Sequence, residues 1–156
     1  KTEGHIDQSL FARTILDEKN GPPPEVNLFN EKNNGESILN LIDKGYVKSA
    51  HDISLGGLLV AISKMCIKGN KGIKINKSKN LINEIEYFFA EDQGRYLIEI
   101  NKEDLKEVTK ILNKNSVHHE ELGIIIQNDM IINEKTKVTI DELKSYYTNW
   151  LSKYMS

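Results

Sequence analysis

Ser49–Met65, SAHDISLGGLLVAISKM, predicts a strand that passes through a glycine turn into a helix. The strand covers residues 47–53 and is bounded by Gly45. Apolar side chains recur along the helix at the spacing of one helical face, and these are Leu58, Leu59, Ala61, Ile62, Met65 and Cys66. Ser54 is the predicted N-cap, because its hydroxyl can accept a hydrogen bond from a free backbone N–H of the first turn. The rest of the chain is organised around this strand–turn–helix.

Gly56 and Gly57 fall at the start of the predicted helix, where glycine is a poor helix former. Either another backbone or a ligand approaches where a Cβ would collide, or the glycines only let the helix pack tightly on the sheet. A strand that enters a helix through glycines also suits an anion, since free N–H groups and the positive end of the helix dipole meet there. The Asp52 carboxylate would repel a phosphate at this turn unless a cation or a basic side chain lies between them.

The string HDISLGGL, residues 51–58, resembles the HD(I/V/L)S(D/E)GGL signature of the C-terminal domain in the aminoimidazole ribonucleotide (AIR) synthetase-related superfamily. That superfamily includes phosphoribosylformylglycinamidine synthase, selenophosphate synthetase, a hydrogenase maturation factor and thiamine-monophosphate kinase. Leu55 departs from the signature, which has an acidic residue before the glycines. The resemblance implies that this chain has the fold of that domain.

Length and composition fit one domain, and we expect a single AIR synthase-related C-terminal domain over residues 1–156. Such a length can fold without disulfides or a metal. The one cysteine, Cys66, falls on the apolar helix face, so we expect a core residue and a reducing, cytoplasmic location. The chain starts at Lys1 without a methionine, so we expect a piece excised from a longer polypeptide.

Charge and hydropathy exclude two classes of partner. With 21 basic and 23 acidic side chains the net charge is −2, which argues against a nucleic-acid-binding protein. No apolar run approaches the roughly 20 residues that a membrane-spanning helix needs. No signal peptide opens the chain, so no membrane partner is expected.

The remaining sequence alternates predicted helices and strands. Helices are expected over residues 8–16, 27–44, 81–89, 102–113 and 140–154, and strands over 72–76 and 95–100. The three prolines of Gly21–Pro24 stop the first helix, because they force an extended segment. Residues 122–126 and 130–132 are predicted to form a hairpin across Gln127–Asp129. The order predicts an α+β fold with a mixed β-sheet covered by α-helices.

Three faces carry further expectations. The helix from Asn27 is expected to bury a stripe of Ile38, Leu39, Leu41 and Ile42. The final helix has an apolar face that we expect in the core or at a domain interface, formed by Ile140, Leu143, Tyr147, Trp150, Leu151 and Tyr154. A basic run is expected to form a solvated sheet edge whose lysines blunt strand pairing, namely Lys68, Lys71, Lys74, Lys77 and Lys79.

A second polar group, Glu91–Arg95 (EDQGR), directly precedes the predicted strand at residues 95–100. It offers two carboxylates for a cation, the Gln93 amide, and a guanidinium suited to bidentate phosphate binding. The alternative is a polar turn in which Arg95 pairs with Glu91 or Asp92. Both interpretations stay open on the residues alone.

FAEDQGRY, residues 89–96, resembles the F(G)EDQGR(Y/F) segment of the phosphoribosylformylglycinamidine synthase family, where other superfamily members carry different residues. Three more stretches are similar to that family: GHIDQSLFARTIL with GPPPEVNL, the helix that contains Asn33 and Gly35, and the terminal NWLSKYM. The resemblance runs from residue 4 to residue 155. Two stretches depart from it. The family has Leu-Gly where this chain has Ile6–Asp7, and Thr- and Gly-rich residues where it has Ile125–Asn128.

Two other groups of polar residues are not interpreted as sites. His118 and His119 are neighbours in an extended stretch, so their side chains point to opposite faces and cannot easily share a zinc ion. His51, Asp52 and Ser54 have the residue types of a nucleophilic triad, but adjacent strand residues diverge, so we expect a local polar network at His51. No catalytic residue is assigned to this chain.

The resemblance implies a part of an ATP-dependent amidoligase of de novo purine biosynthesis. That enzyme uses ATP, Mg²⁺ and glutamine-derived ammonia to convert formylglycinamide ribonucleotide to formylglycinamidine ribonucleotide. Its catalytic histidine and main ATP-binding residues are expected in upstream domains of the same chain. A separate glutaminase subunit is expected to supply its ammonia. This piece alone is therefore expected to be inactive.

The anion chemistry and the shared signature together predict the site residues. Those expected to bind nucleotide or phosphate are Asp52, Ser54, Gly56, Gly57 and Arg95, and those expected as metal ligands or a polar turn are Glu91, Asp92 and Gln93. One alternative is the C-terminal domain of a sister enzyme of the AIR synthetase or selenophosphate synthetase type, which should lack EDQGRY. The other is a non-catalytic dimerisation or docking module that uses the proline segment and the aromatic helix face.

Overall fold

A computed structural model describes residues 1–76, 83–150 and 154–155. Contacts divide the chain into two units: Lys1–Ala61 with Ile82–Glu120, and Ile62–Leu81 with Glu121–Ser156. Each unit is described by itself below. No helix among the described residues is both long and apolar enough to cross a membrane.

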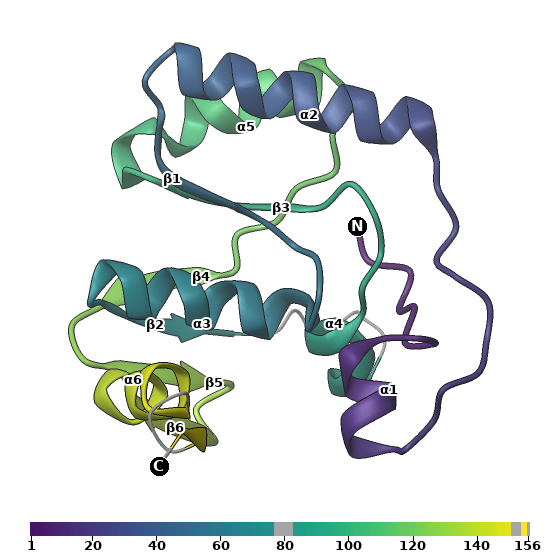
Figure 1. Cartoon of the computed structure of the whole chain (residues 1–156). Helices are drawn as coiled ribbons and strands as arrows, with labels where there is room; N and C mark the ends of the chain where they lie inside the picture. The colour runs from purple at the N-terminus through teal and green to yellow at the C-terminus, as the bar shows by residue number, and fades with distance from the viewer. Residues whose placement is uncertain (77–82, 151–153, 156) are drawn as a thin grey trace. The chain divides into compact units, whose positions relative to one another are not determined.

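The first unit is built on two antiparallel strands, β1 (Val47–Asp52) and β3 (Tyr96–Ile100). They pair in register from Val47 opposite Ile100 to Asp52 opposite Tyr96, with an irregularity after Val47. Two helices, α2 (Leu28–Asp43) and α5 (Leu105–Lys114), lie side by side next to these strands (Figure 1). The core of this layer is formed by Leu41, Val108, Leu112 and Val117, with partly buried Ile98, Ile100 and Tyr46 against it.

Capping side chains explain where the helices of this unit begin. Ser9 accepts a hydrogen bond from the Ala12 N–H at the start of α1 (Leu10–Ile15), and Asn27 accepts one from Asn30 at the start of α2. Asn83 does the same for α4 (Glu84–Phe89). A short 3₁₀ turn, η1 (Lys102–Asp104), leads into α5. Gly45, with φ +75°, follows the end of α2, as the sequence predicts for a helix stop.

The second unit holds a four-stranded mixed sheet in the order β4-β2-β5-β6. Its strands are β2 (Gly72–Ile75), β4 (Gly123–Ile126), β5 (Asp129–Ile132) and β6 (Thr136–Thr139). β2 pairs antiparallel with β4 and parallel with β5, and β5 pairs antiparallel with β6. The helix α6 (Ile140–Thr148) follows β6, and α3 (Gly57–Gly69) starts in the first unit and continues into this one. The α+β class with a mixed sheet is confirmed.

The hairpin predicted from residues 122–126 and 130–132 is wrong. β2 lies between β4 and β5, so these strands are not neighbours. The observed hairpin joins β5 to β6, a strand that the sequence interpretation missed. Its turn is at Asn133 and Glu134, which have φ of 50° and 57°. Positive φ at successive residues twists a tight turn to match two antiparallel strands, whereas Gln127–Asn128 lacks such a conformation.

Three other expectations need correction. Leu39 and Ile42 of α2 are 61% and 44% exposed, because only the side of the helix that carries Leu41 faces the strands. Of the lysine run, Lys74 is not on a sheet edge, because β2 is an inner strand, and Lys68 lies in α3. The helix α3 begins at Gly57, so Ser54 is not its N-cap; the Ser54 carbonyl instead accepts from the Gly57 N–H at 2.8 Å.

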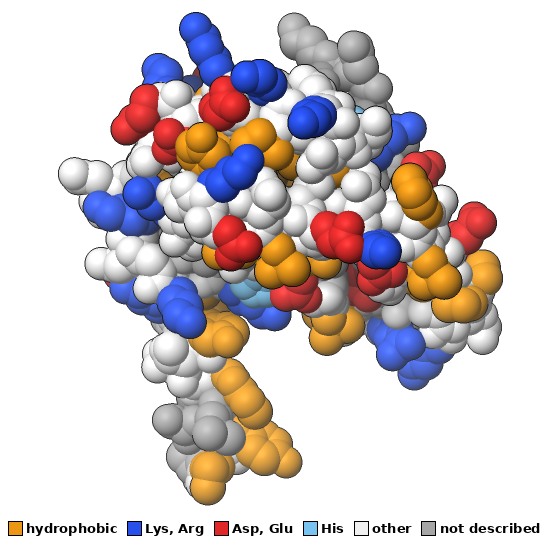
Figure 2. Space-filling view, turned by 90° about the horizontal axis from the view of Figure 1, so that it is seen from above, with side chains coloured by type: hydrophobic (Ala, Val, Ile, Leu, Met, Phe, Trp, Pro, Cys, Tyr) orange, Lys and Arg blue, Asp and Glu red, His pale blue; other side chains and the backbone are white. Residues whose placement is uncertain are grey.

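The aromatic face of the final helix is not part of the core. Tyr147, Trp150 and Tyr154 are all exposed, and Trp150 is 62% exposed. Figure 2 shows how hydrophobic side chains gather in small groups between charged ones on one face of the chain. Other predicted positions, Lys77, Lys79, Leu81 and Leu151, lie outside the described residues.

Candidate functional site

The glycine corner, residues Asp52–Gly57, connects the end of β1 to the start of α3 within the first unit. Asp52, Ser54 and Leu55 are exposed at this corner, whereas Gly56 and Gly57 are buried. Both glycines have positive φ, +86° and +70°. The corner therefore presents side chains on its outside and glycine backbone on its inside.

Close packing explains Gly57. A Cβ on this residue would lie 2.7–2.8 Å from backbone atoms of Phe88 and Phe89, at the end of α4. That is much closer than a real Cβ approaches another atom. Of the explanations considered for the glycines, the approach of another protein backbone is the one that the geometry shows at Gly57.

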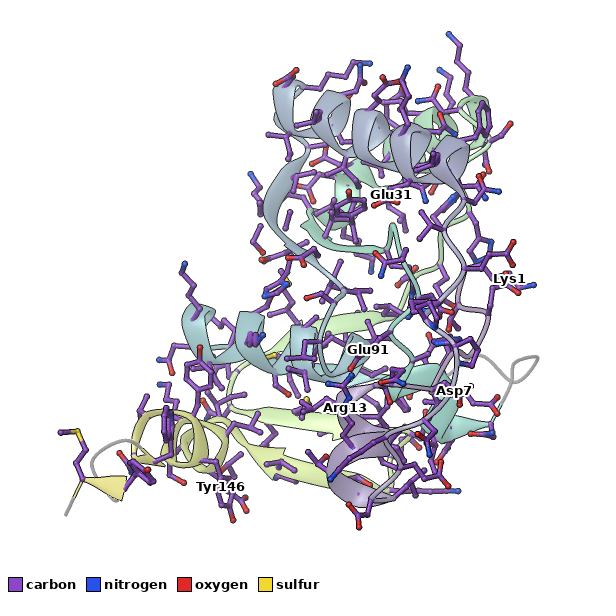
Figure 3. All side chains as sticks on the ribbon, turned by 45° about the vertical axis from the view of Figure 1, so that its right-hand side comes forward. Lys1, Asp7, Arg13, Glu31, Glu91 and Tyr146 are labelled. Carbon is purple, nitrogen blue, oxygen red and sulfur yellow. The ribbon has the colours of Figure 1, made fainter. Side chains whose placement is uncertain are left out.

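Glu91 joins the EDQGR turn to the glycine corner. The Glu91 side chain is labelled in Figure 3. Its Oε1 atom accepts a hydrogen bond from the Gly56 N–H at 2.7 Å and another from the Leu10 N–H, at the start of α1, also at 2.7 Å. The Glu91 N–H in turn donates to the His5 carbonyl at 3.0 Å. The sequence predicts that free N–H groups at this turn could bind an anion. The Gly56 N–H instead donates to the Glu91 carboxylate of the protein itself.

Asp92 and Arg95 form a buried pair inside the same turn. Asp92 is 8% exposed, and it accepts from the Thr2 hydroxyl at 2.5 Å and the His5 N–H at 3.3 Å. The Arg95 guanidinium lies 3.5 Å from Asp92 and donates to the Ala90 carbonyl at 3.2 Å. Burial lowers the pKa of Arg95, and the Asp92 carboxylate opposes this shift. This is the geometry of the polar-turn alternative.

The last residues of the turn connect it to α2. Gly94 has φ +65°, and its carbonyl accepts from the Asn34 side-chain amide at 3.0 Å. A Cβ on Gly94 would lie 3.3 Å from the Glu31 Cα atom, so the α2 backbone also comes close here. Gln93 is exposed, so it is the member of EDQGR that faces solvent.

Two histidines, His51 and His119, have local polar contacts. His51 Nδ1 is 3.4 Å from the Asp52 carboxylate, which fits the expected local network. His119 Nδ1 is 3.0 Å from the Val117 carbonyl oxygen, while His118 is exposed. Within the part of the chain that the structure describes, no three His, Cys, Asp or Glu side chains are grouped so as to hold a metal ion.

Several residues of this polar region were missed by sequence reasoning. Thr2 and His5 reach Asp92 from the other end of the sequence, and the Tyr87 hydroxyl donates to Glu120 at 3.0 Å. Burial, together with the Glu120 carboxylate, raises the pKa of Tyr87 above its ordinary value. The His5 Nε2 atom is buried without a hydrogen-bond partner among the described residues. No local pattern marks these residues, because their partners are far away in the sequence.

The α+β fold with its mixed sheet is that of a known class of domain. The family described as "AIR synthase related protein, C-terminal domain" matches residues 7–133, and this chain belongs to that family. The predicted superfamily resemblance is therefore confirmed.

The chain is also similar to particular proteins of this class. It is 66% identical over 155 residues to the phosphoribosylformylglycinamidine synthase subunit PurL of Pelagibacter ubique, covering 99% of this chain and 21% of that protein. The PurL subunit of Bartonella henselae is 38% identical over 151 residues, covering 97% of this chain and 20% of that protein. The chain thus spans about a fifth of the length of these curated relatives.

Solved structures share the fold. "T. maritima PurL complexed with FGAR" matches with a TM-score of 0.71 at 21% identity, over 85% of this chain and 24% of that one. "T. maritima PurL complexed with ATP" matches with a TM-score of 0.63 at 20% identity, over 72% of this chain and 21% of that one. At this level of identity the likeness concerns the fold alone.

Proposed function

We propose that this chain is the C-terminal domain, residues 1–156, of a phosphoribosylformylglycinamidine synthase. The observation that carries the proposal is the 66% identity to a PurL subunit along 99% of the chain. The complete enzyme is then a cytoplasmic, ATP-dependent amidoligase that converts formylglycinamide ribonucleotide and ammonia to formylglycinamidine ribonucleotide. The Thermotoga maritima neighbours, which include a "PurLQS" structure, support a separate glutaminase subunit as the source of ammonia.

In this proposal the chain contributes no catalytic residue and no magnesium site. Magnesium prefers several oxygen ligands in near-ideal geometry. Glu91 Oε1 and both Asp92 oxygens are already engaged by backbone N–H groups, the Thr2 hydroxyl and Arg95. The described residues also group no three His, Cys, Asp or Glu side chains here, so the turn does not fit a magnesium set. We therefore assign ATP and Mg²⁺ to upstream domains of the longer polypeptide.

The glycine corner is proposed to face the nucleotide or substrate-phosphate cleft of the complete enzyme. Exposed Asp52 and Ser54 supply the polar side chains, and buried Gly56, Gly57 and Arg95 hold the corner in shape. The Ser54 hydroxyl can donate to or accept from ribose hydroxyls, and the Asp52 carboxylate can accept from them. A phosphate beside Asp52 requires a cation or a basic group from another domain. Gln93 adds an exposed amide on the EDQGR turn.

The enzyme assignment is tested on the purified full-length protein. With ATP, Mg²⁺, formylglycinamide ribonucleotide and ammonia, we expect equal amounts of ADP and formylglycinamidine ribonucleotide. ADP release without the amidine product would overturn the assignment. The isolated 156-residue chain is expected to show no turnover in the same assay.

The role of the corner has its own test. Asp52→Ala and Ser54→Ala are expected to weaken binding of formylglycinamide ribonucleotide by about two- to tenfold each, the equivalent of one hydrogen bond. Asp43→Ala, at the exposed end of α2, is the matched control and should leave binding unchanged. Unchanged affinity in both corner variants would refute the cleft-facing role but not the enzyme assignment.

A docking module is the second candidate, and the exposed aromatic side chains near the C-terminus favour it. Tyr146, Tyr147 and Trp150 are exposed on and after α6. Clusters of exposed aromatic residues are typical of protein interfaces. A melting temperature that rises with protein concentration, and loses this dependence in Trp150→Ser, would support docking between copies. A melting temperature independent of concentration would count against it.

A further inference from the structure

One carboxylate oxygen fixes two separate backbone segments of the first unit. Glu91 Oε1 accepts from Leu10 and from Gly56, which are 81 and 35 residues away in the sequence. Both N–H···O distances are 2.7 Å, which is the short range typical of hydrogen bonds to a charged acceptor. The Glu91 backbone is itself held by the His5 carbonyl. Glu91 therefore links the N-terminal segment, the start of α1 and the glycine corner.

The Gly56 bond helps to fix the corner, together with the bonds from the Gly57 N–H to the Ser54 carbonyl and from the Ile53 N–H to the Arg95 carbonyl, both at 2.8 Å. Gly56 has φ +86°, and glycine crosses into and out of this conformation more easily than any other residue. Leu55, 59% exposed, brings no charge that could hold the turn from its other side. The Glu91 carboxylate therefore restricts Gly56 itself, beside the Ser54–Gly57 bond within the corner.

We propose that Glu91 is the positioning residue of the glycine corner, and that it sets where the exposed Asp52 and Ser54 side chains lie for the ribonucleotide. This inference rests on the cleft-facing role proposed above. In this role Glu91 acts by holding the backbone N–H of Gly56 and does not contact the ligand. The buried Asp92–Arg95 pair next to it keeps the turn itself rigid.

The first part of the test measures directly whether Glu91 protects the Gly56 and Leu10 amides. Hydrogen–deuterium exchange of the full-length protein is followed in peptides that contain Gly56 and Leu10. Glu91→Ala should speed exchange at both amides by roughly tenfold or more, because each loses a charged acceptor. Glu91→Gln keeps a neutral oxygen at the same place and should give an intermediate increase. Glu103→Gln, an exposed acid of η1, is the matched control and should change neither amide.

The second part measures affinity for formylglycinamide ribonucleotide in the same variants. The inference is supported if affinity falls in the order Glu91→Gln, then Glu91→Ala, in parallel with faster exchange at Gly56. Unchanged exchange at Gly56 in Glu91→Ala overturns it, whatever the affinity does. Faster exchange with unchanged affinity also overturns it. In that case Asp52→Ala decides between the claims: weaker binding there leaves the proposed role of the corner intact, and unchanged binding removes that role as well.

Discussion

Substituting Gly57 by alanine should destabilise the chain, because both the backbone conformation at this position and the atoms around it oppose a Cβ. At φ +70°, a residue with a Cβ is strained by about 1–2 kcal/mol. The new Cβ would also lie 2.7–2.8 Å from backbone atoms of Phe88 and Phe89, which cannot swing away as a side chain can. Overpacking of this kind costs about 1–3 kcal/mol. The two effects add to a loss of about 2–5 kcal/mol.

Two other glycines separate these contributions. Gly45 has φ +75° but nothing within 4 Å of a Cβ, so Gly45→Ala should cost only the backbone strain, about 1–2 kcal/mol. Gly69 has open space around its Cβ position, and its backbone is not in the left-handed region. Gly69→Ala should therefore change stability by no more than about 1 kcal/mol and is expected to stabilise.

Urea unfolding of the 156-residue chain, followed by circular dichroism, measures all three variants under one condition. In thermal unfolding of the same variants, a chain of this size shifts its melting temperature by roughly 2–4 °C for each kcal/mol, so Gly57→Ala should lower it by about 4–20 °C. If Gly57→Ala costs no more than Gly45→Ala, the close approach of α4 to the glycine corner is refuted, and only the backbone conformation would explain Gly57.

Further predictions concern the buried groups. Asp92→Ala should cost about 3–5 kcal/mol in urea unfolding, because it leaves the buried Arg95 guanidinium without its partner; a loss below 1 kcal/mol would contradict that pairing. Burial raises the pKa of the Cys66 thiol to about 11, so its alkylation at pH 8 should be about 100-fold slower than in the urea-unfolded chain. Because the unfolded chain loses this proton first, the free energy of unfolding should fall between about pH 9 and pH 11, and by less in Cys66→Ser. Leu41→Ala, at 0% exposure, should cost about 2–5 kcal/mol, and Leu39→Ala, at 61%, within about 0.5 kcal/mol.

Local signals in the sequence were sufficient for most elements. The strand–turn–helix around HDISLGGL, the strand after EDQGR and the helix stop at Gly45 are all present near their predicted bounds. Each depends on periodicity or turn chemistry within a few residues, which the sequence displays directly. The family resemblance then pointed to the correct fold class.

Interactions between distant segments were not predictable. The pairing of β2 with β5 has no mark in either strand, so the interpretation joined the nearest candidates, residues 122–126 and 130–132, instead. The sequence predicts Glu91 as a metal ligand or part of a polar turn, because a carboxylate can bind a cation. Only the structure shows that its oxygen is taken by Leu10 and Gly56.

The inner position of β2 matters while the chain is being synthesised. Gly72–Ile75 leaves the ribosome before either of its neighbours in the sheet has been translated. At roughly 5–20 residues per second, the start of β5 follows by several seconds. During that delay both edges of β2 are open, and the charges of Lys71 and Lys74 oppose its association with other nascent chains. The lysines of this stretch thus protect a strand that must wait for its partners.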